Sequence, residues 1–342
     1  MMKIMKTTGF LFVIGIVAPL IWSSSTALAG ESYDQVLAGA KKESQVLFFE
    51  SQPDKVWVKL MKAFQAKYPF IKSMRHTRLF GGRLNTKIIT DAQAGKGSAD
   101  LMTSSPVAIS ALLKRNLLQK VDWKGIGIPE KSIYDEFSSL STMFYYALGY
   151  NTNLVKGADI PKNWDDMLDS KWANKGGWWR YSQPWPILAK NWGQARAENY
   201  LKSLLGSKLR SARSPTALTN WLIAGEVHVA IAPVTRIQEA RKKGAPVNWV
   251  VPDPVPMTRL IFGVLKGAKH PNAAKLLVHW LSSTEGASMY EKMTNRGNPY
   301  VKGSPMGKVI ATHNAIIYPK KELAELKRSS AAMAAILKAA KK

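Results

Sequence analysis

Cysteine is absent from the 342-residue sequence. Its absence excludes disulfide bonds, cysteine nucleophiles, iron–sulfur clusters, thiolate zinc sites and lipid attachment at an N-terminal cysteine. Histidine is scarce, and the five histidines include no pair at the spacing of metal ligands, which argues against a metal site built on histidine. Acidic residues are also few: 23 Asp and Glu face 49 Lys and Arg, for a formal net charge of +26. A chain this basic suggests nucleic acid, an anionic membrane surface or an anionic ligand as its partner.

Several signature motifs are missing as well. The sequence contains no G-x-S-x-G, no H-E-x-x-H and no phosphate-binding loop, so it does not predict the common hydrolases, metalloproteases or nucleotide-binding enzymes. It also lacks the RNP motif, the helix-turn-helix pattern and the metal-finger spacing of nucleic-acid-binding domains. The basic residues are spread along the chain, where they either solvate an ordinary surface or gather an anionic ligand. We therefore expect no nucleic acid partner and no cofactor.

The first 29 residues have the pattern of a secretory signal peptide. Lys3 and Lys6 precede an apolar run over residues 9–22, and Ala27-Leu28-Ala29 matches a small-residue cleavage site. The run is too short to span a bilayer comfortably, and no later stretch approaches the ~18 apolar residues that a span requires. We expect cleavage after Ala29 and export of the remaining chain.

Strand patterns and helix patterns alternate after the signal peptide. The expected strands cover residues 45–50, 100–103, 144–150, 176–180, 227–232 and 248–251. The expected helices cover residues 32–42, 56–68, 84–94, 106–113, 163–168, 195–205, 215–224, 272–281, 285–293 and 331–340. This alternation predicts an α/β fold. About 310 residues exceed one comfortable core, so we expect two α/β lobes.

Polar side chains follow the ends of several expected strands. Ligands of open α/β sheets bind beyond the carboxyl ends of the strands, so these side chains are the candidate ligand contacts. They are Ser51, Gln52, Ser104, Ser105, Arg180, Tyr181, Thr235 and Arg236. Serine hydroxyls and arginine guanidinium groups suit the oxygens of carboxylates, phosphates or phosphonates. Ser105 has a second interpretation, as the cap of the helix that begins at Pro106, and both interpretations can hold.

Two other clusters allow more than one interpretation. Tryptophans at 178, 179, 185 and 192 belong either to the core or to the wall of a site for an organic ligand. The pair Asp165-Asp166 stands near an expected helix start, where acidic side chains favour the helix dipole; this outweighs a catalytic carboxylate pair.

Short segments along the chain carry the pattern of one protein family. They are AKKE at 40–43, AFQAKYP at 63–69, GYNTNLV at 149–155, PKNWDDML at 161–168, GEV at 225–227, GAPV at 244–247, HPNAAKL at 270–276 and STEG at 283–286. In their order and spacing, over roughly residues 33–300, the chain resembles the periplasmic substrate-binding proteins of ABC importers. The resemblance is to the group that includes ferric-ion, thiamine and aminoethylphosphonate binders.

The resemblance implies a type II periplasmic-binding-protein fold, with two α/β lobes, a hinge and one ligand in the cleft between them. On that basis residues 30–143 and 251–293 form lobe one, residues 144–250 form lobe two, and residues 294–342 form a C-terminal helical segment packed on lobe two. It further implies a monomeric periplasmic receptor that passes a small solute to an ABC permease in the inner membrane. An exported enzyme on the same fold is the alternative from another functional class.

Departures from the family's ferric-ion binders bear on the ligand. Those members place a Tyr-Tyr pair after the strand that corresponds to residues 227–232, where this chain has Pro233-Val234-Thr235-Arg236, and many place a histidine within the loop that is 51–54 here. Tyr150 remains a candidate ligand contact, whereas Tyr145-Tyr146 lies inside an expected strand, whose alternation points the two rings to opposite faces. Arginine near a bare cation is electrostatically unfavourable. We therefore expect an anionic or anion-bearing solute, with ferric ion as the runner-up and no bound metal.

Overall fold

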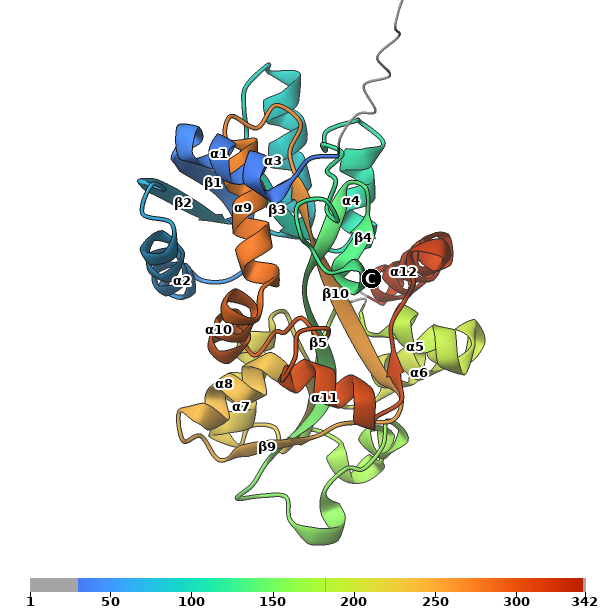
Figure 1. Cartoon of the computed structure of the whole chain (residues 1–342). Coiled ribbons are helices and arrows are strands. Elements are labelled where there is room, and N and C mark those ends of the chain that lie inside the picture. Colours follow the sequence, from blue (N-terminus) through green and yellow to red (C-terminus); the bar gives the residue numbers. More distant parts are fainter. Residues whose placement is uncertain (1–29, 182, 341–342) are drawn as a thin grey trace, which may run out of the picture. The chain divides into compact units, whose positions relative to one another are not determined.

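The computed structural model describes residues 30–181 and 183–340 of the chain (Figure 1). The chain divides into two units, Met1–Gly30 and Glu31–Lys342. The expected signal peptide, residues 1–29, lies outside the described residues. The account below concerns the second unit alone.

The second unit is built on one continuous sheet whose strands follow the order β2-β1-β3-β10-β5-β8-β6-β7. In this article, the first half of the sheet is its β2-β1-β3 side and the second half is its β8-β6-β7 side. The α/β prediction is confirmed, because parallel strands in both halves are connected through helices.

The first half contains three parallel strands, β1 (Gln45–Glu50), β2 (Ser73–Arg78) and β3 (Leu101–Ser104). Its helices are α1 (Tyr33–Glu43), α2 (Asp54–Lys67), α3 (Gly81–Gln93) and α4 (Pro106–Leu113). Helix α2 illustrates why these segments fold this way. Val56, Leu60 and Phe64 recur at four-residue spacing, share one helix face and are buried in the core with Phe48 of β1.

Two long antiparallel strands connect the halves, β5 (Ser138–Asn151) and β10 (Val255–Val264), which run side by side in Figure 1. Strand β5 pairs with β10 as far as Tyr145 and then, from Tyr146, with β8. The short strands β4 (Ile133–Asp135) and β9 (Val247–Val250) also pair with β5, and β11 (Ala315–Ile316) pairs with β10.

The second half contains the parallel strands β6 (Gly176–Trp179), β7 (Arg210–Ala212) and β8 (Val229–Pro233). Its helices are α5 (Trp185–Trp192), α6 (Gln194–Gly206), α7 (Pro215–Ala224) and α8 (Val234–Lys242). Its core is unusually aromatic: Trp164, Trp178 and Trp185 are all fully buried and pack edge to face in pairs. All four tryptophans singled out from the sequence, at 178, 179, 185 and 192, pack in or against this core.

The chain then returns through α9 (Pro271–Ser282) and α10 (Thr284–Thr294) and ends with α11 (Pro305–Thr312) and α12 (Leu323–Ala339). Helix α9 packs on α1 and β1, whereas α12 packs on α5 and α6. Single 3₁₀ turns occur at Glu130–Ser132, Gly157–Asp159, Asp165–Leu168, Ser170–Trp172 and Lys320–Glu322. Within the described ranges, no helix combines the length and the apolar character needed to cross a membrane.

Several elements differ from the expected ones. Strands β4, β7 and β11 and helices α5, α8 and α11 were not expected, and three further differences have a clear physical reason. Strand β2 was not expected, because its sequence SMRHTR is polar and half-exposed at the edge of the sheet. Strand β10 was not expected because prolines precede it; its pairing with β5 begins at Met257, one residue beyond Pro256, so no ladder bond there requires a proline N–H. The expected helix at 163–168 is a single 3₁₀ turn over Asp165–Leu168, in which Asp166 accepts the N–H groups of Lys162 and Asn163.

Candidate functional site

A cavity of about 490 Å³ lies between the two halves of the sheet. Ser51 after β1, Phe80 after β2 and Ser105 after β3 line it from the first half. Trp179 and Tyr181 at the end of β6, with Thr235 and Arg236 after β8, line it from the second half. Phe144 and Tyr146 of β5 and Thr258 and Leu260 of β10 also line it. The cavity thus lies where the strand ends of both halves converge, as α/β topology predicts for a ligand site.

The Ser51 loop is held by a buried carboxylate and two arginines. Glu50 is 1% exposed and accepts hydrogen bonds from Ser51 Oγ (2.9 Å), the Gln52 N–H (2.5 Å) and Trp57 Nε1 (3.0 Å). Arg78 Nε donates to the Ser51 carbonyl (3.0 Å), and Arg296 Nη1 donates to Ser51 Oγ (2.9 Å). The Ser51 hydroxyl therefore has fixed partners on both sides, which fixes its orientation at the cavity wall.

Arg296 reaches the cavity from the segment that follows α10. Gly297 exchanges two backbone hydrogen bonds with Met143 of β5, which places Arg296 beside the next residue of that strand, Phe144. The guanidinium carbon of Arg296 lies 4.8 Å from the centre of the Phe144 ring, within the range of a cation–π contact. Its Nε is buried and has no hydrogen-bond partner among residues 30–181 and 183–340.

Arg236 lies in the first turn of α8, directly after the buried Thr235. Its Nη1 donates to Glu239 (2.8 Å), one helical turn further along, and Glu239 also accepts from Lys243 (3.0 Å). Burial raises the pKa of Glu239, but hydrogen bonds from Lys243 and Arg236 outweigh it, so the net pKa is lowered. The ionised Glu239 accepts from one Nη of the Arg236 guanidinium, and the other N–H groups have no hydrogen-bond partner among residues 30–181 and 183–340, so they can donate to a solute.

Aromatic rings form one wall of the cavity. Trp179 stacks on Tyr181 with ring centres 4.6 Å apart and an interplanar angle of 10°, and it is nearly parallel to Tyr146 at 6.2 Å and 16°. Burial raises the pKa of Tyr146 well above its usual 10 and raises the pKa of Tyr181 as well. Both phenols therefore keep their protons at neutral pH and present O–H donors instead of anionic oxygens.

The charge of the lining has one sign. Four arginines line the cavity: Arg78, Arg83, Arg236 and Arg296. Across the part of the chain that the structure describes, no aspartate, glutamate, lysine or histidine lines it with them. Nor do the described residues contain a group of three or more histidine, aspartate or glutamate side chains placed to hold a metal ion. Besides the arginines, the lining includes hydroxyls, aromatic rings, the Gln183 amide and a few aliphatic side chains, which together suit an anion attached to an organic body.

The structure brings five of the expected site residues to the cavity: Ser51, Ser105, Tyr181, Thr235 and Arg236. Both interpretations of Ser105 hold, because it lines the cavity and its hydroxyl accepts the Ala108 N–H as the cap of α4. Tyr145 and Tyr146 do lie on opposite faces of β5, since Tyr145 lines a different cavity.

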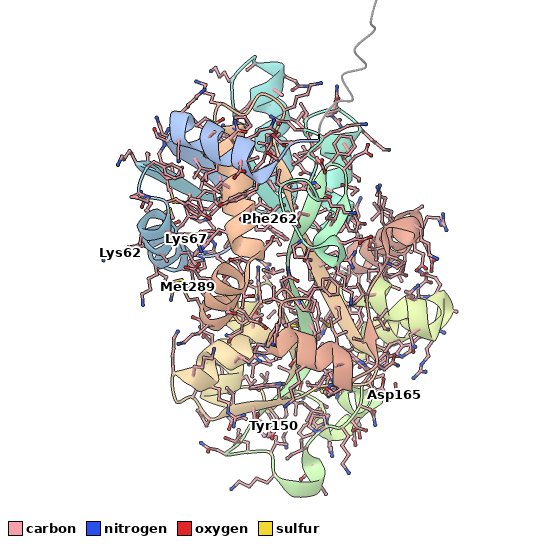
Figure 2. The ribbon with its side chains drawn as sticks, in the orientation of Figure 1. Lys62, Lys67, Tyr150, Asp165, Phe262 and Met289 are labelled. Atoms are coloured by element: carbon pink, nitrogen blue, oxygen red, sulfur yellow. The ribbon has the colours of Figure 1, made fainter. Side chains whose placement is uncertain are left out.

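The other four expected residues do not line this cavity. Gln52 is buried beside Glu50, and Ser104 is fully buried within β3. Arg180 turns toward α12, where its Nη2 donates to the Leu337 carbonyl (3.0 Å). Tyr150 is buried in the core of the second half, near the end of β5 (Figure 2).

Sequence reasoning missed three of the four arginines. Arg78 and Arg83 flank the β2–α3 turn, and they would have been candidates had β2 been expected, because they follow its end. Arg296 has no local signal, since a backbone pairing with the distant Met143 places it.

Comparisons with known proteins agree with this architecture. The family model for bacterial extracellular solute-binding protein matches residues 52–288. Iron-bound HitA from Pseudomonas aeruginosa has a similar structure, with a TM-score of 0.72 and 20% identity over 85% of this chain and 99% of that chain. AfuA from Actinobacillus pleuropneumoniae, with exogenous fructose-6-phosphate bound, gives a TM-score of 0.70 and 20% identity over 86% and 98%.

A third solved structure, IdiA (FutA) of Trichodesmium in complex with iron and citrate ligands, gives a TM-score of 0.66 and 15% identity over 86% of this chain and 98% of that chain. No curated protein sequence matches the chain. The expected type II periplasmic-binding-protein fold is confirmed. The chain belongs to the bacterial extracellular solute-binding proteins, the family of ABC-importer receptors that deliver small molecules to a permease.

Proposed function

We propose that this receptor binds a small organic anion in the cavity between the two halves of its sheet. The observation that carries the proposal is that four arginines line the cavity. No acidic residue is among the described residues that line it. Guanidinium groups form strong, often bidentate hydrogen bonds with carboxylate or phosphate oxygens. The volume of about 490 Å³ falls in the range of ~300–1,000 Å³ typical of sites for organic molecules, and an inorganic anion alone would leave most of it unfilled.

The two halves of the sheet act as two lobes in this proposal. Residues 30–143 and 251–293 form lobe one, residues 144–250 form lobe two, and residues 294–342 form the C-terminal segment. The change of partner along β5, from β10 at Tyr145 to β8 at Tyr146, supports a boundary near residue 144. The strands β5 and β10 then form the hinge. A solute that touches Ser51 and Arg236 at once contacts both lobes and shifts the open–closed equilibrium toward closure.

The ferric-ion alternative has less support in the lining. Two structurally similar proteins carry iron in their descriptions, but another carries fructose-6-phosphate. Ferric ion prefers hard anionic oxygen donors, and no aspartate or glutamate is among the described residues that line the cavity. Arginines next to a bare cation would also repel it. A tyrosinate-to-iron charge-transfer band on addition of chelated ferric ion would restore this alternative.

A binding role is better supported than catalysis. An enzyme on this fold needs a positioned base and nucleophile in its cleft. The cavity residues that the structure describes include no histidine, aspartate or glutamate to act as that base. In this proposal the protein acts as a binding protein, in the periplasm and as a monomer, after removal of residues 1–29. Turnover of a bound compound by the purified protein would favour the enzyme.

The test is a thermal-shift and calorimetric screen of carboxylates, phosphates, phosphonates, thiamine, polyamines, sugars and chelated ferric ion. A ligand at ~100 times its Kd stabilises the protein by roughly 2.7 kcal/mol, which is enough to detect. We expect hits among organic anions, with Arg236→Gln and Arg296→Gln each lowering affinity by about 10- to 100-fold, because charge-assisted hydrogen bonds are lost. Arg115→Gln, a change at an exposed arginine on a different surface, is the matched control. Binding confined to neutral or cationic solutes, or wild-type affinity in both cavity variants, contradicts the proposal.

A further inference from the structure

Two aromatic rings are exposed inside the cavity. The large hydrophobic side chains that are exposed, among the residues the structure describes, are Val58, Phe80, Leu154, Tyr181 and Tyr300. Of these, Phe80 and Tyr181 line the cavity, and each is 38% exposed. Uncovered aromatic surface inside a ligand cavity is surface that a bound molecule can bury.

The two rings come from opposite sides of the cavity. Phe80 follows β2 in the first half and precedes α3, and Tyr181 follows β6 in the second half. Trp179 stacks in parallel on one face of Tyr181, so the exposed part of that ring is its other face and its edges. Around the glycines after Phe80, Gly81 and Gly82, no atom lies within 4 Å of an added Cβ, so this segment has room to adjust to a ligand. A flat ring fits between two such surfaces through stacked or edge-to-face contacts.

Two hydrogen-bond donors of the same cavity lack acceptors. The Tyr146 hydroxyl is buried on a side chain that is 1% exposed, and it has no partner among the described residues. The buried Nε of Arg296 also has no hydrogen-bond partner among the described residues. The rest of that guanidinium is held by a hydrogen bond to the Ser51 hydroxyl and by contact with the Phe144 ring. Unpaired buried donors also occur elsewhere among the described residues, for example at Trp123 and Trp172, but only those of Tyr146 and Arg296 belong to residues that line this cavity. A ligand or water in the cavity can supply the acceptor that relieves their cost of desolvation. A carboxylate or phosphate offers only acceptors, so it suits both donors at once.

We propose that the solute is a planar ring bearing a carboxylate or phosphate group, with the anionic group on Tyr146 and Arg296 and the ring between Phe80 and Tyr181. This inference rests on the proposed function and narrows its ligand class. Tyr146 is buried and Tyr181 is 38% exposed, so in this arrangement the anionic group lies at the buried part of the cavity and the ring lies nearer the solvent. The aromatic rings then select for flat solutes, and the two donors select for the charge.

The experiment compares matched anions that differ only in planarity. Isothermal titration calorimetry measures benzoate against cyclohexanecarboxylate and phenyl phosphate against cyclohexyl phosphate, with benzamide as the uncharged ring. We expect the planar member of at least one anionic pair to bind about tenfold more tightly than its saturated partner, because two ring contacts add to its affinity. The pair that shows this preference identifies the anionic group. Benzamide is expected to bind at least tenfold more weakly than benzoate.

Variants separate the two parts of the site. Phe80→Leu and Tyr181→Leu keep apolar volume but remove a flat ring, so each lowers the planar-to-saturated affinity ratio to below about threefold. Tyr146→Phe and Arg296→Gln lower the affinity of both members of a pair by about tenfold and preserve their ratio. Tyr300→Leu is the matched control, since Tyr300 is exposed to the same degree but does not line the cavity.

Each result has one interpretation. Equal affinity within both pairs, a preference for the saturated rings, or an unchanged ratio in both Phe80→Leu and Tyr181→Leu overturns the aromatic clamp while the anion receptor stands. If none of these planar anions binds at millimolar concentration but other anions do, the inference is also overturned. Binding of uncharged or cationic solutes alone removes the proposed function together with the inference.

Discussion

At the scale of single residues, buried polar groups fall into two kinds. Glu50 and Tyr200 are paired: the Glu50 carboxylate accepts several donors, and the Tyr200 hydroxyl donates to the Trp164 carbonyl at 2.5 Å. Tyr146 and Arg296 each keep an unpaired donor at the cavity. Removing a paired group leaves its partner unsatisfied, whereas removing an unpaired donor relieves a cost of desolvation. Stability measurements can therefore distinguish a paired buried group from an unpaired one.

A comparison of two tyrosines tests this distinction. We expect Tyr200→Phe to lower the free energy of unfolding by about 1–2 kcal/mol, because the Trp164 carbonyl loses its buried donor. Tyr146→Phe is expected to leave it unchanged or to raise it slightly, because the deleted hydroxyl has no partner among the described residues. Urea denaturation of the unliganded protein measures both. An equal loss of stability in the two variants would mean that Tyr146 already has an acceptor in the free protein.

At the scale of elements, Glu43 connects two helices that are distant in sequence. It ends α1, and its carboxylate accepts the backbone N–H groups of Asn272 (3.2 Å) and Ala273 (2.7 Å) and the Asn272 side-chain amide (2.6 Å). Helix α9 starts at Pro271, and His270 before it provides no side-chain cap. The carboxylate of α1 therefore takes the place of a local cap at the N-terminus of α9, where a negative charge also favours the helix dipole.

We expect Glu43→Gln to lower the free energy of unfolding by about 0.5–2 kcal/mol, since it removes the charge and one accepting oxygen from the start of α9. The measurement is urea denaturation beside Glu198→Gln, a change at an exposed acid on α6 whose hydrogen bond is to Gln194 one turn away. If Glu43→Gln is no more destabilising than the control, the cap contributes nothing.

Local signals explain which elements the sequence predicts. The cap of α4 by Ser105 and the buried face of α2 depend on residues within one segment, so composition and spacing reveal them. Strand β2 lacks such a signal because it is a polar edge strand, and prolines precede β10. The cap of α9 spans 229 residues of sequence, and no pattern within either helix indicates it.

The same division applies to the site. Ser51, Ser105, Tyr181, Thr235 and Arg236 were predictable because each comes just after an expected strand, and α/β topology brings strand ends together. Arg180 also follows a strand, but its side chain turns toward α12, a choice that depends on packing far along the chain. Arg296 reaches the cavity only because Gly297 pairs with Met143. The sequence therefore predicts five residues of the lining, but only one of its four arginines, Arg236.

At the scale of the whole molecule, charge outside the cavity adds to charge within it. The full sequence has a net charge of +26, to which the expected signal peptide contributes only Lys3 and Lys6, and the described lining of the cavity carries four arginines and no acid. A field of this sign draws anions toward the cleft and raises their association rate, and dissolved salt screens it. The arginines inside the cavity act at contact distance, where screening is weaker. The rates and the equilibrium should therefore respond differently to salt.

We expect affinity for a fully ionised anion to change by less than about threefold from pH 6 to pH 9, because guanidinium groups stay protonated in proteins. Burial holds the pKa of Tyr146 well above 10, so this donor is lost only in strongly alkaline solution, where a phenolate would also repel the anion.

Raising ionic strength from about 0.02 to 0.5 M should slow association by several-fold and change dissociation little. Stopped-flow tryptophan fluorescence measures both rates. An uncharged solute that does not bind this protein is the negative control for the fluorescence change. An affinity that changes with a single titration between pH 6 and pH 8 would contradict the role of these arginines in selecting the solute. An association rate that does not change with salt would contradict it as well.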